Sequence, residues 1–213
     1  METFLNQVDA LTGFSTTDND ALSDWLTFGA REIINMMPNK MKQKCSKLFV
    51  LNDTNGTTLD LDDKGKVLHV TRKYASDKHH VPCREVSPLL ADSANDSTSI
   101  HKASKTDPVY YITSNSSSEP RLFVLPTPTN DEPSNAYCVN YPTIAHGEGA
   151  SGIANFPDEL EYLVVLYAAI KALEAQAILE EDPELYLPLI QNLKQDYTQG
   201  LQLSGVIASQ GAK

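Results

Sequence analysis

Residues 156–179 read FPDELEYLVVLYAAIKALEAQAIL, and this stretch decides the fold. Pro157 occupies a helix-start position, and Asp158 and Glu159 follow in the first turn, where the helix dipole favours acidic side chains. From Leu160 onward the stretch is almost uninterrupted apolar or Ala. For about three turns, over 160–170, the predicted helix has no polar face, so it must be covered on every side.

Two ways of covering this helix remain open. The other predicted helices are few, but three of them are enough to wrap a fourth in a monomeric bundle, and the many Ala residues allow close helix approach. Alternatively, a neighbouring copy of the chain completes the burial. This second possibility places four residues at a contact between copies: Val164, Val165, Tyr167 and Ala168.

A second C-terminal helix follows the start signal at 182–184. Leucine or tyrosine recurs every four residues from Leu185 to Leu201, which is typical of a helix with one apolar face. Pro188 stands either in its first turn or at a kink. Residues 204–213 are small and polar, and we expect a flexible tail there.

The N-terminal residues 1–45 are also predicted to be helical. A short helix ends at Gly13, and the N-cap candidates at 15–20 start a second one of about five turns. That helix ends before Pro38, because the residue preceding a proline disfavours the helical conformation.

The central residues 46–145 lack a sustained helical period and are rich in Thr, Ser, Asn, Asp and Pro. Asn55-Gly56 predicts a hairpin between strands at 48–51 and 57–61. The other predicted strands lie at 67–71, 109–112, 122–125 and 137–139, the second and third of these forming a hairpin. The polar stretch 87–107 is predicted to be a mobile loop.

The fold class predicted is therefore α+β. N- and C-terminal helices form a bundle from residues 1–45 and 150–203, and an antiparallel β-sandwich or barrel is inserted at 46–145. The tail 204–213 lies outside both domains.

The charge distribution limits the classes of partner. Lys and Arg number 17 against 28 Asp and Glu, a formal net charge of −11, which disfavours tight phosphate binding. From residue 155 onward there are nine acidic residues against three lysines, and they include Glu174, Glu180, Glu181 and Glu184. A basic cluster lies instead after the second helix, at Lys40, Lys42 and Lys44. Opposite charges at the two helical ends favour contacts between copies in a ring.

Targeting and redox signals are weak. Residues 1–5 do not look like a secretory signal, and we expect no apolar stretch long enough to cross a membrane. Three cysteines, an odd number far apart in the chain, favour reduced thiols over a disulfide framework.

The catalytic motifs are poorly formed. The glycine pattern at 147–152 lacks the strand and helix that a phosphate loop requires, and the acidic run 60–65 lacks the final carboxylate of a calcium loop. His79, His80 and Cys83 have no second set of metal ligands. We therefore expect neither catalytic residues nor a bound metal or cofactor, and interpret the chain as a protein that is not an enzyme.

Three phrases carry a resemblance to a known family: DWLTFGAREIIN at 24–35, DPVYYI at 107–112 and FPDELEYLVVLYAA at 156–169. Together with the order of helices, β-insertion and helices, they resemble the head-to-tail connector (adaptor or neck) proteins of tailed bacteriophages. The resemblance covers most of the chain as an architecture, although its phrases are packing patterns rather than chemical motifs.

The resemblance implies a structural virion protein of the neck, made in the host cytoplasm. Its partners would be other copies in a ring, usually twelvefold, together with the portal protein and a downstream tail or neck protein. Double-stranded DNA would pass through without specific binding, along the acidic residues from Glu174 to Glu184, and no membrane is involved. Leu203, Val206 and Ile207 would belong to a tail that docks on the portal.

Two other functions are kept as alternatives. The β-insertion could be a module that binds a receptor or carbohydrate on an exposed cluster of Tyr110, Tyr111 and Tyr137. A metal-assisted enzyme using His79, His80 and Cys83 is the third possibility.

Overall fold

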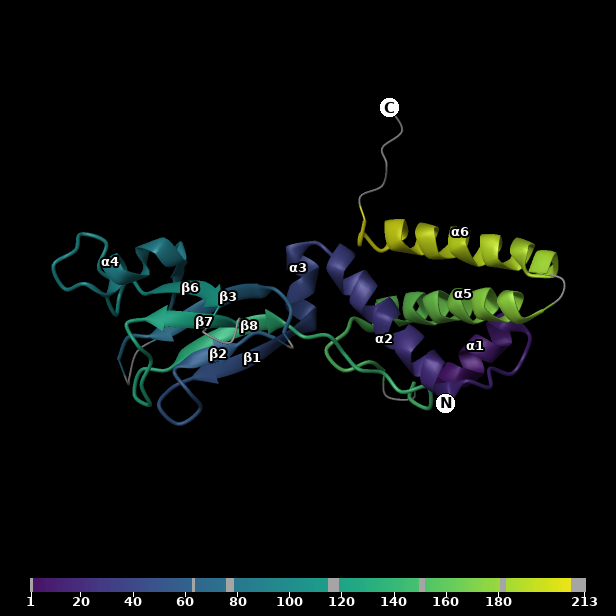
Figure 1. Ribbon diagram of the computed structural model, residues 1–213, viewed down its shortest axis with the longest axis horizontal. Helices are drawn as coiled ribbons and strands as arrows, with labels where there is room; N and C mark the ends of the chain where they lie inside the picture. The colour runs from purple at the N-terminus through teal and green to yellow at the C-terminus, as the bar shows by residue number, and fades with distance from the viewer. Residues whose placement is uncertain are drawn as a thin grey trace, which may run out of the picture. The chain divides into compact units, whose positions relative to one another are not determined.

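The structure, a computed structural model, describes residues 2–62, 64–75, 79–114, 119–149, 152–180 and 183–207 (Figure 1). The chain is mixed α+β, as the sequence predicts. It divides into two compact units. The helical unit comprises Met1–Cys45 and Tyr141–Lys213, and the β unit comprises Ser46–Asn140.

The helical unit is built around four longer helices. These are α1 (Phe4–Thr12), α2 (Asn19–Met36), α5 (Glu161–Leu179) and α6 (Leu187–Leu203). Its short helical segments are α3 (Asn39–Lys42), η1 (Gln43–Cys45), η3 (Asp158–Leu160) and η4 (Pro183–Leu185). Figure 1 shows α6 alongside α5 on one side, with α1 and α2 on the other.

Several predicted helix ends are confirmed. The Asp18 side chain caps α2 by accepting a hydrogen bond from the Ala21 N–H, and Gly13 ends α1 in the left-handed conformation, with φ 77°. Pro188 lies in the first turn of α6 and does not kink it, because the missing N–H has no helical partner there.

Helix α5 is the centre of the helical unit. Its buried residues are distributed around the whole circumference, because α1, α2 and α6 each pack against it. They are Leu163, Val164, Val165, Ala168, Ala169, Ile170, Ala172 and Leu173. The chain's own helices thus provide most of the cover that the sequence demands.

Two glycines allow the neighbouring helices to approach α5. A Cβ at Gly29 of α2 would lie 2.8 Å from Tyr167 Cδ1, and a Cβ at Gly200 of α6 would lie 2.5 Å from Leu163 Cδ2. Both distances are shorter than carbon atoms tolerate. At each glycine, the backbone of the neighbouring helix therefore packs directly against a side chain of α5.

The segment after the β unit runs along the helices. Phe4 N–H donates to the Glu148 carbonyl at 2.7 Å, and Ile144 N–H donates to Thr27 Oγ1 at 3.0 Å. Tyr141 OH donates to Asn35 Oδ1 at 2.7 Å. Residues 141–145, which the sequence pattern places in the insertion, thus belong to the helical unit. The sequence does not reveal this, because the hydrogen-bond partners of Tyr141 and Ile144 lie on α2, more than a hundred residues earlier.

The β unit contains two four-stranded sheets. One has the order β1 (Ser46–Leu51), β8 (Ser134–Val139), β3 (Val67–Lys73) and β4 (His80–Pro82), and all of its pairs are antiparallel. The other has the order β2 (Thr58–Asp60), β7 (Pro120–Leu125), β6 (Val109–Ser114) and β5 (Arg84–Glu85), in which only β5 and β6 are parallel. Neither sheet closes on itself in the described part of the chain, so the predicted barrel is not formed.

One hydrophobic cluster joins the two sheets. It includes Leu51, Val70 and Ala136 from the first sheet and Leu122 and Val124 from the second. The two ends of the unit meet in the first sheet, where Ser46 pairs with Val139. Buried apolar residues of both sheets therefore share one interior.

The predicted hairpin across Asn55-Gly56 is wrong in its pairing. Only an isolated bridge, Asn52 to Gly56, closes the turn, and β1 and β2 then join different sheets. The Asn-Gly pair predicts the turn but not the strand partner, because β2 pairs with β7, about sixty residues further along the chain. The predicted hairpin of 109–112 and 122–125 is confirmed as β6 and β7.

The predicted mobile loop at 87–107 is also wrong, because that stretch contains the helical segments η2 (Pro88–Leu90) and α4 (Ala91–Asn95). Ala94 and Ala103 pack with Val109 in a small hydrophobic cluster. Ala103 N–H donates to the Ala94 carbonyl at 2.8 Å, which joins the end of α4 to the segment that follows it. The polar composition of 87–107 did not reveal this cluster, because that stretch contributes only two small alanines to it and Val109 follows the stretch.

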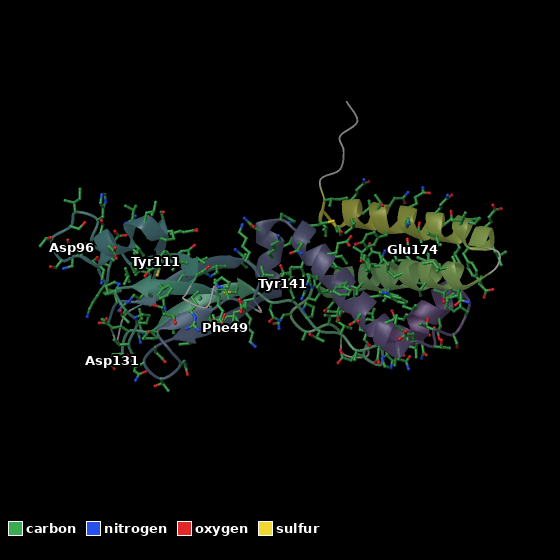
Figure 2. All side chains as sticks on the ribbon, viewed as in Figure 1. Phe49, Asp96, Tyr111, Asp131, Tyr141 and Glu174 are labelled. Atoms are coloured by element: carbon green, nitrogen blue, oxygen red, sulfur yellow. The ribbon has the colours of Figure 1, made fainter. Side chains whose placement is uncertain are left out.

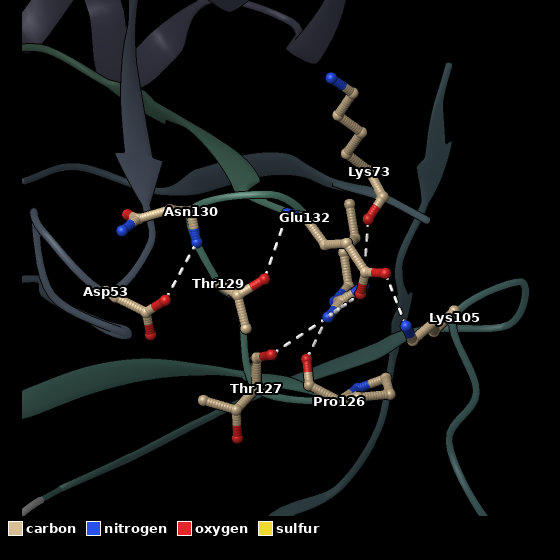
Figure 3. Close-up of polar contacts among 9 residues, drawn as sticks. Asp53, Lys73, Lys105, Pro126, Thr127, Thr129, Asn130 and Glu132 are labelled. Carbon is tan, nitrogen blue, oxygen red and sulfur yellow. Dashed lines mark hydrogen bonds and ion pairs between the residues drawn. The ribbon is translucent and has the colours of Figure 1, made fainter. Parts of the chain in front are cut away.

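A buried arginine fastens one end of the β unit. Arg72 donates to the carbonyls of Pro126, Lys73 and Thr127 at 3.0 Å, and its guanidinium lies 3.3 Å from Glu132 Oε2. Glu132 also accepts from Lys105 at 2.6 Å, as Figure 3 shows. Because the guanidinium is almost fully enclosed, these partners satisfy a charge that would otherwise be costly to bury.

We expect Gly29→Val to destabilise the helical unit by about 1–3 kcal/mol, because the added side chain on α2 would collide with the ring of Tyr167, which must then move. Thermal unfolding followed by circular dichroism measures this. Gly147→Ala is the matched control, since no described heavy atom beyond its chain neighbours lies within 4 Å of the new Cβ. Equal midpoints for the two variants would contradict the close approach.

We also expect Glu132→Gln to change the acid sensitivity of the β unit. A hydrogen bond from Lys105, against the opposing effect of burial and with help from Arg72, holds the pKa of Glu132 below its usual 4.5. A lowered folded-state pKa contributes stability above the unfolded value, and this contribution is lost as the pH falls through the folded value. Denaturant unfolding between about pH 6 and about pH 3 should therefore show a shallower loss of stability in the variant.

The matched control for that experiment is Asp131→Asn, which removes an exposed neighbouring carboxylate without touching Arg72 or Lys105. A Glu132→Gln slope identical to that of the wild type would show that the carboxylate does not stabilise this part of the fold.

Candidate functional site

Burial favours the neutral forms of Cys83 and His80, two of the residues considered for a metal-assisted enzyme. Burial raises the pKa of the Cys83 thiol to about 12 and lowers the pKa of His80. His80 Nδ1 lies 3.4 Å from Thr71 Oγ1, and no group of three or more potential metal ligands occurs among the residues that the structure describes. Cys83 is therefore a protonated thiol at neutral pH and a poor nucleophile.

The residues predicted to form the contact between copies need correction. Val164, Val165 and Ala168 are buried beneath the other helices of the same chain. Tyr167 is half-buried, with its ring 6.1 Å from that of Tyr197 and its Cδ1 against Gly29. The first three are therefore not accessible to a partner unless the helical unit opens.

The predicted acidic face needs correction as well. Glu174 Oε2 lies 2.8 Å from Lys171 Nζ, and Glu174 Oε1 lies 2.8 Å from Lys194 Nζ of α6 (Figure 2). Burial alone would raise the pKa of Glu174, but hydrogen bonds from both lysines outweigh it and hold that pKa below its usual range. Glu174 therefore ties α5 to α6, and Glu180 and Glu184 are the predicted acids that remain exposed. Glu181 lies outside the described residues.

Four exposed large apolar residues of the helical unit lie where α5 ends and α6 begins, whereas the others, Phe28, Tyr162 and Leu203, lie apart from them. Ile178 and Leu179 are 83% and 80% exposed, Leu185 is 73% exposed, and Leu187 is also exposed. We call these four residues the apolar tip. Leu179 also lines a cleft of about 160 Å³ together with Trp25 and Ala172, so the tip continues into the side of the bundle.

The predicted basic cluster lies around α3, and its members differ in their surroundings. Lys44 Nζ is 2.6 Å from Glu159 Oε1, so its charge is already paired within the chain. Lys42 Nζ donates to the Asn35 carbonyl at 2.9 Å, and the Arg31 guanidinium lies 5.1 Å from the centre of the Tyr141 ring. Lys40 is exposed.

We call Arg31, Lys40 and Lys42 the basic end. Within the helical unit, Figure 1 shows α3 at one extremity and the C-terminal end of α5 and the start of α6 at the other. The basic end and the apolar tip with its exposed Glu180 and Glu184 therefore lie at opposite extremities of one unit.

Only one of the three predicted portal-docking residues is exposed. Leu203 is 88% exposed, Val206 is buried, and Ile207 is half-buried. The N–H groups of Val206 and Ile207 both donate to the Leu201 carbonyl, which folds the chain back onto the end of α6. Residues 208–213 of the predicted tail lie outside the described part.

The aromatic cluster predicted for the β unit is not formed. Tyr110 is buried and donates to Glu85 Oε2 at 2.9 Å, while Tyr137 stacks on His69 in the other sheet at 4.2 Å. Tyr111 instead stacks on Phe123, with ring centroids 5.1 Å apart and planes 5° apart. This half-exposed pair on β6 and β7 is what remains of the proposed binding surface (Figure 2).

One helical span has the length and composition to cross a membrane, contrary to the sequence-based expectation. Asp158–Leu179 is 22 residues long, and its most apolar window has a mean hydropathy of 1.6. Half of that window is buried inside the structure, as in the core helix of a bundle, which passes the same test. The span is weak evidence for a membrane, and packing explains its apolar character.

The candidate functional site is thus a pair of surfaces on the helical unit, the apolar tip and the basic end. Their exposed apolar and basic side chains are of the kinds that contact other proteins. No family model matches the chain, and no curated protein matches it at a significant level.

Proposed function

We propose that this chain is a structural virion protein, a head-to-tail connector whose copies form a ring below the portal. The single observation that carries the proposal is the apolar tip. Ile178, Leu179 and Leu185 expose most of their surface to water, whereas aliphatic side chains of this size are stabilised by about 1.5–3 kcal/mol when buried. A second protein surface is the ordinary means of covering such a patch.

The finer architecture belongs to the same proposal. We regard the helical unit as the ring-forming bundle and the two sheets as a sandwich inserted into it. The cluster shared by the sheets supports the sandwich, since residues from both contribute to one interior. The packing of α5 against α1, α2 and α6 supports the bundle.

The charge of the helical unit suits a conduit for DNA. Seven Lys and Arg stand against sixteen Asp and Glu in this unit. On α6, the exposed residues include Gln191, Asn192, Gln195, Asp196 and Gln199, and Lys194 is paired with Glu174. A surface without free cations along this helix would not hold phosphates, and its acids would repel the duplex within about 8 Å at physiological salt.

The remaining partners follow from the same hypothesis. The portal protein and a downstream tail or neck protein would bind the ring in the virion, and Leu203 is the exposed apolar residue nearest the C-terminal tail. The β unit would face outward or toward the tail. No cofactor, metal or membrane is required for this role.

We expect Ile178→Glu with Leu185→Glu to abolish association between copies, because two charges would replace the apolar surface that a neighbour covers. Native mass spectrometry and light scattering across a concentration series measure the change, with wild type forming a discrete ring of about twelve copies. Ile100→Glu is the control, because Ile100 is even more exposed, at 94%, but lies in the β unit. Assembly of the double variant at wild-type concentrations would refute the role of the tip.

A second candidate function rests on the stacked pair Tyr111–Phe123. Flat, half-exposed aromatic pairs are typical of surfaces that hold a sugar ring or an aromatic group. If the connector proposal is right, a glycan array probed with wild type stays silent, and Tyr111→Ala assembles normally. If the β unit is a binding module, wild type binds a defined glycan and Tyr111→Ala loses at least tenfold in affinity, whereas Ile178→Glu does not.

A further inference from the structure

We infer that the apolar tip of one copy docks on the basic end of the next copy, a head-to-tail contact between unlike surfaces. This inference rests on the proposed function and names the occupant of the tip as a second copy of this chain. It goes beyond ring formation because it specifies which two surfaces meet.

Charge complementarity is the first argument. Glu180 and Glu184 are exposed beside the tip, and the described residues of 178–187 include no Lys or Arg. Residues 31–44 contain four bases and a single acid, Glu32. Lys44 is paired with Glu159, which leaves the three cations of the basic end for an external partner.

The basic end also has the right mixture of apolar and charged groups. Pro38 is exposed, and Met36 and Met41 are half-buried beside the lysines. Met adapts its shape readily to an apolar partner, so leucines of the tip can pack there while Glu180 and Glu184 meet the cations. The contacts of Arg31 with Tyr141 and of Lys42 with the Asn35 carbonyl hold two of these cations in place before a partner arrives.

Placement of the two surfaces decides the symmetry. A two-fold axis passing through either surface would bring tip against tip or basic end against basic end and would oppose like charges, whereas an antiparallel two-fold pair would match both surfaces at once and stop at a dimer, which native mass spectrometry distinguishes from a ring. A head-to-tail contact pairs opposite charges at every junction. Because the surfaces lie at opposite extremities of the helical unit, each copy can use both at once, which produces a closed ring when the rotation between copies closes.

Charge reversal tests this contact. Lys40→Glu with Lys42→Glu reverses the basic end, and Glu180→Lys with Glu184→Lys reverses the acids of the tip. We expect each pair of substitutions alone to raise the concentration for half-assembly at least tenfold in light scattering. The quadruple variant, and an equimolar mixture of the two double variants, should both recover assembly, because every junction again pairs opposite charges.

Lys47→Glu with Lys102→Glu is the matched control, since it makes the same change in net charge on the β unit. Circular dichroism of each variant checks that the fold is retained. Loss of assembly without rescue, or assembly insensitive to both reversals, overturns this contact. If the reversals have no effect but Ile178→Glu with Leu185→Glu still abolishes the ring, the ring proposal survives and only the assigned partner surface is wrong. If the wild type stays monomeric at high concentration, both the ring proposal and the contact between the tip and the basic end are wrong.

Discussion

The burial of α5 is the constraint on which the rest of the helical unit depends. A helix without a polar face loses stability wherever water reaches it, so every neighbour is placed to exclude water from some part of its circumference. The unit meets this constraint with only three other long helices. It does so by bringing backbones close at Gly29 and Gly200, where α2 and α6 pack directly against side chains of α5.

The partner surface arises where this cover ends. The last buried residue of α5 is Leu173, yet the helix continues to Leu179. Its final residues, Ile178 and Leu179, are largely exposed, although Leu179 still lines the cleft beside Trp25 of α2, and the exposed Leu185 and Leu187 follow where the chain enters α6. The choice between a monomeric bundle and burial by another copy is therefore not exclusive, since the middle of α5 is covered by its own chain and its end is available to a partner.

The helix ends could be predicted from local sequence signals. The composition of the surface could not, because it depends on contacts between residues far apart in the chain. Gly13, Asp18 and Pro38 mark helix ends through their own backbone preferences, so those boundaries follow from the sequence. The ion pair of Glu174 with Lys194, by contrast, forms only because α6 packs against α5, and the sequence around either residue does not predict that contact. For the same reason the burial of Val164 could not be separated from burial by a partner, because composition records the need for cover but not its source.

The pairing of Ser46 with Val139 has a consequence for how such a protein changes over time. Both ends of the β unit leave through adjacent positions, about 5 Å apart in an antiparallel pair. To the rest of the chain, this unit is equivalent to a single short surface connection, however many residues it contains. Residues can therefore be added to, exchanged in or removed from the β unit with little effect on the bundle, whereas the helices that pack around α5 stay constrained by its apolar surface.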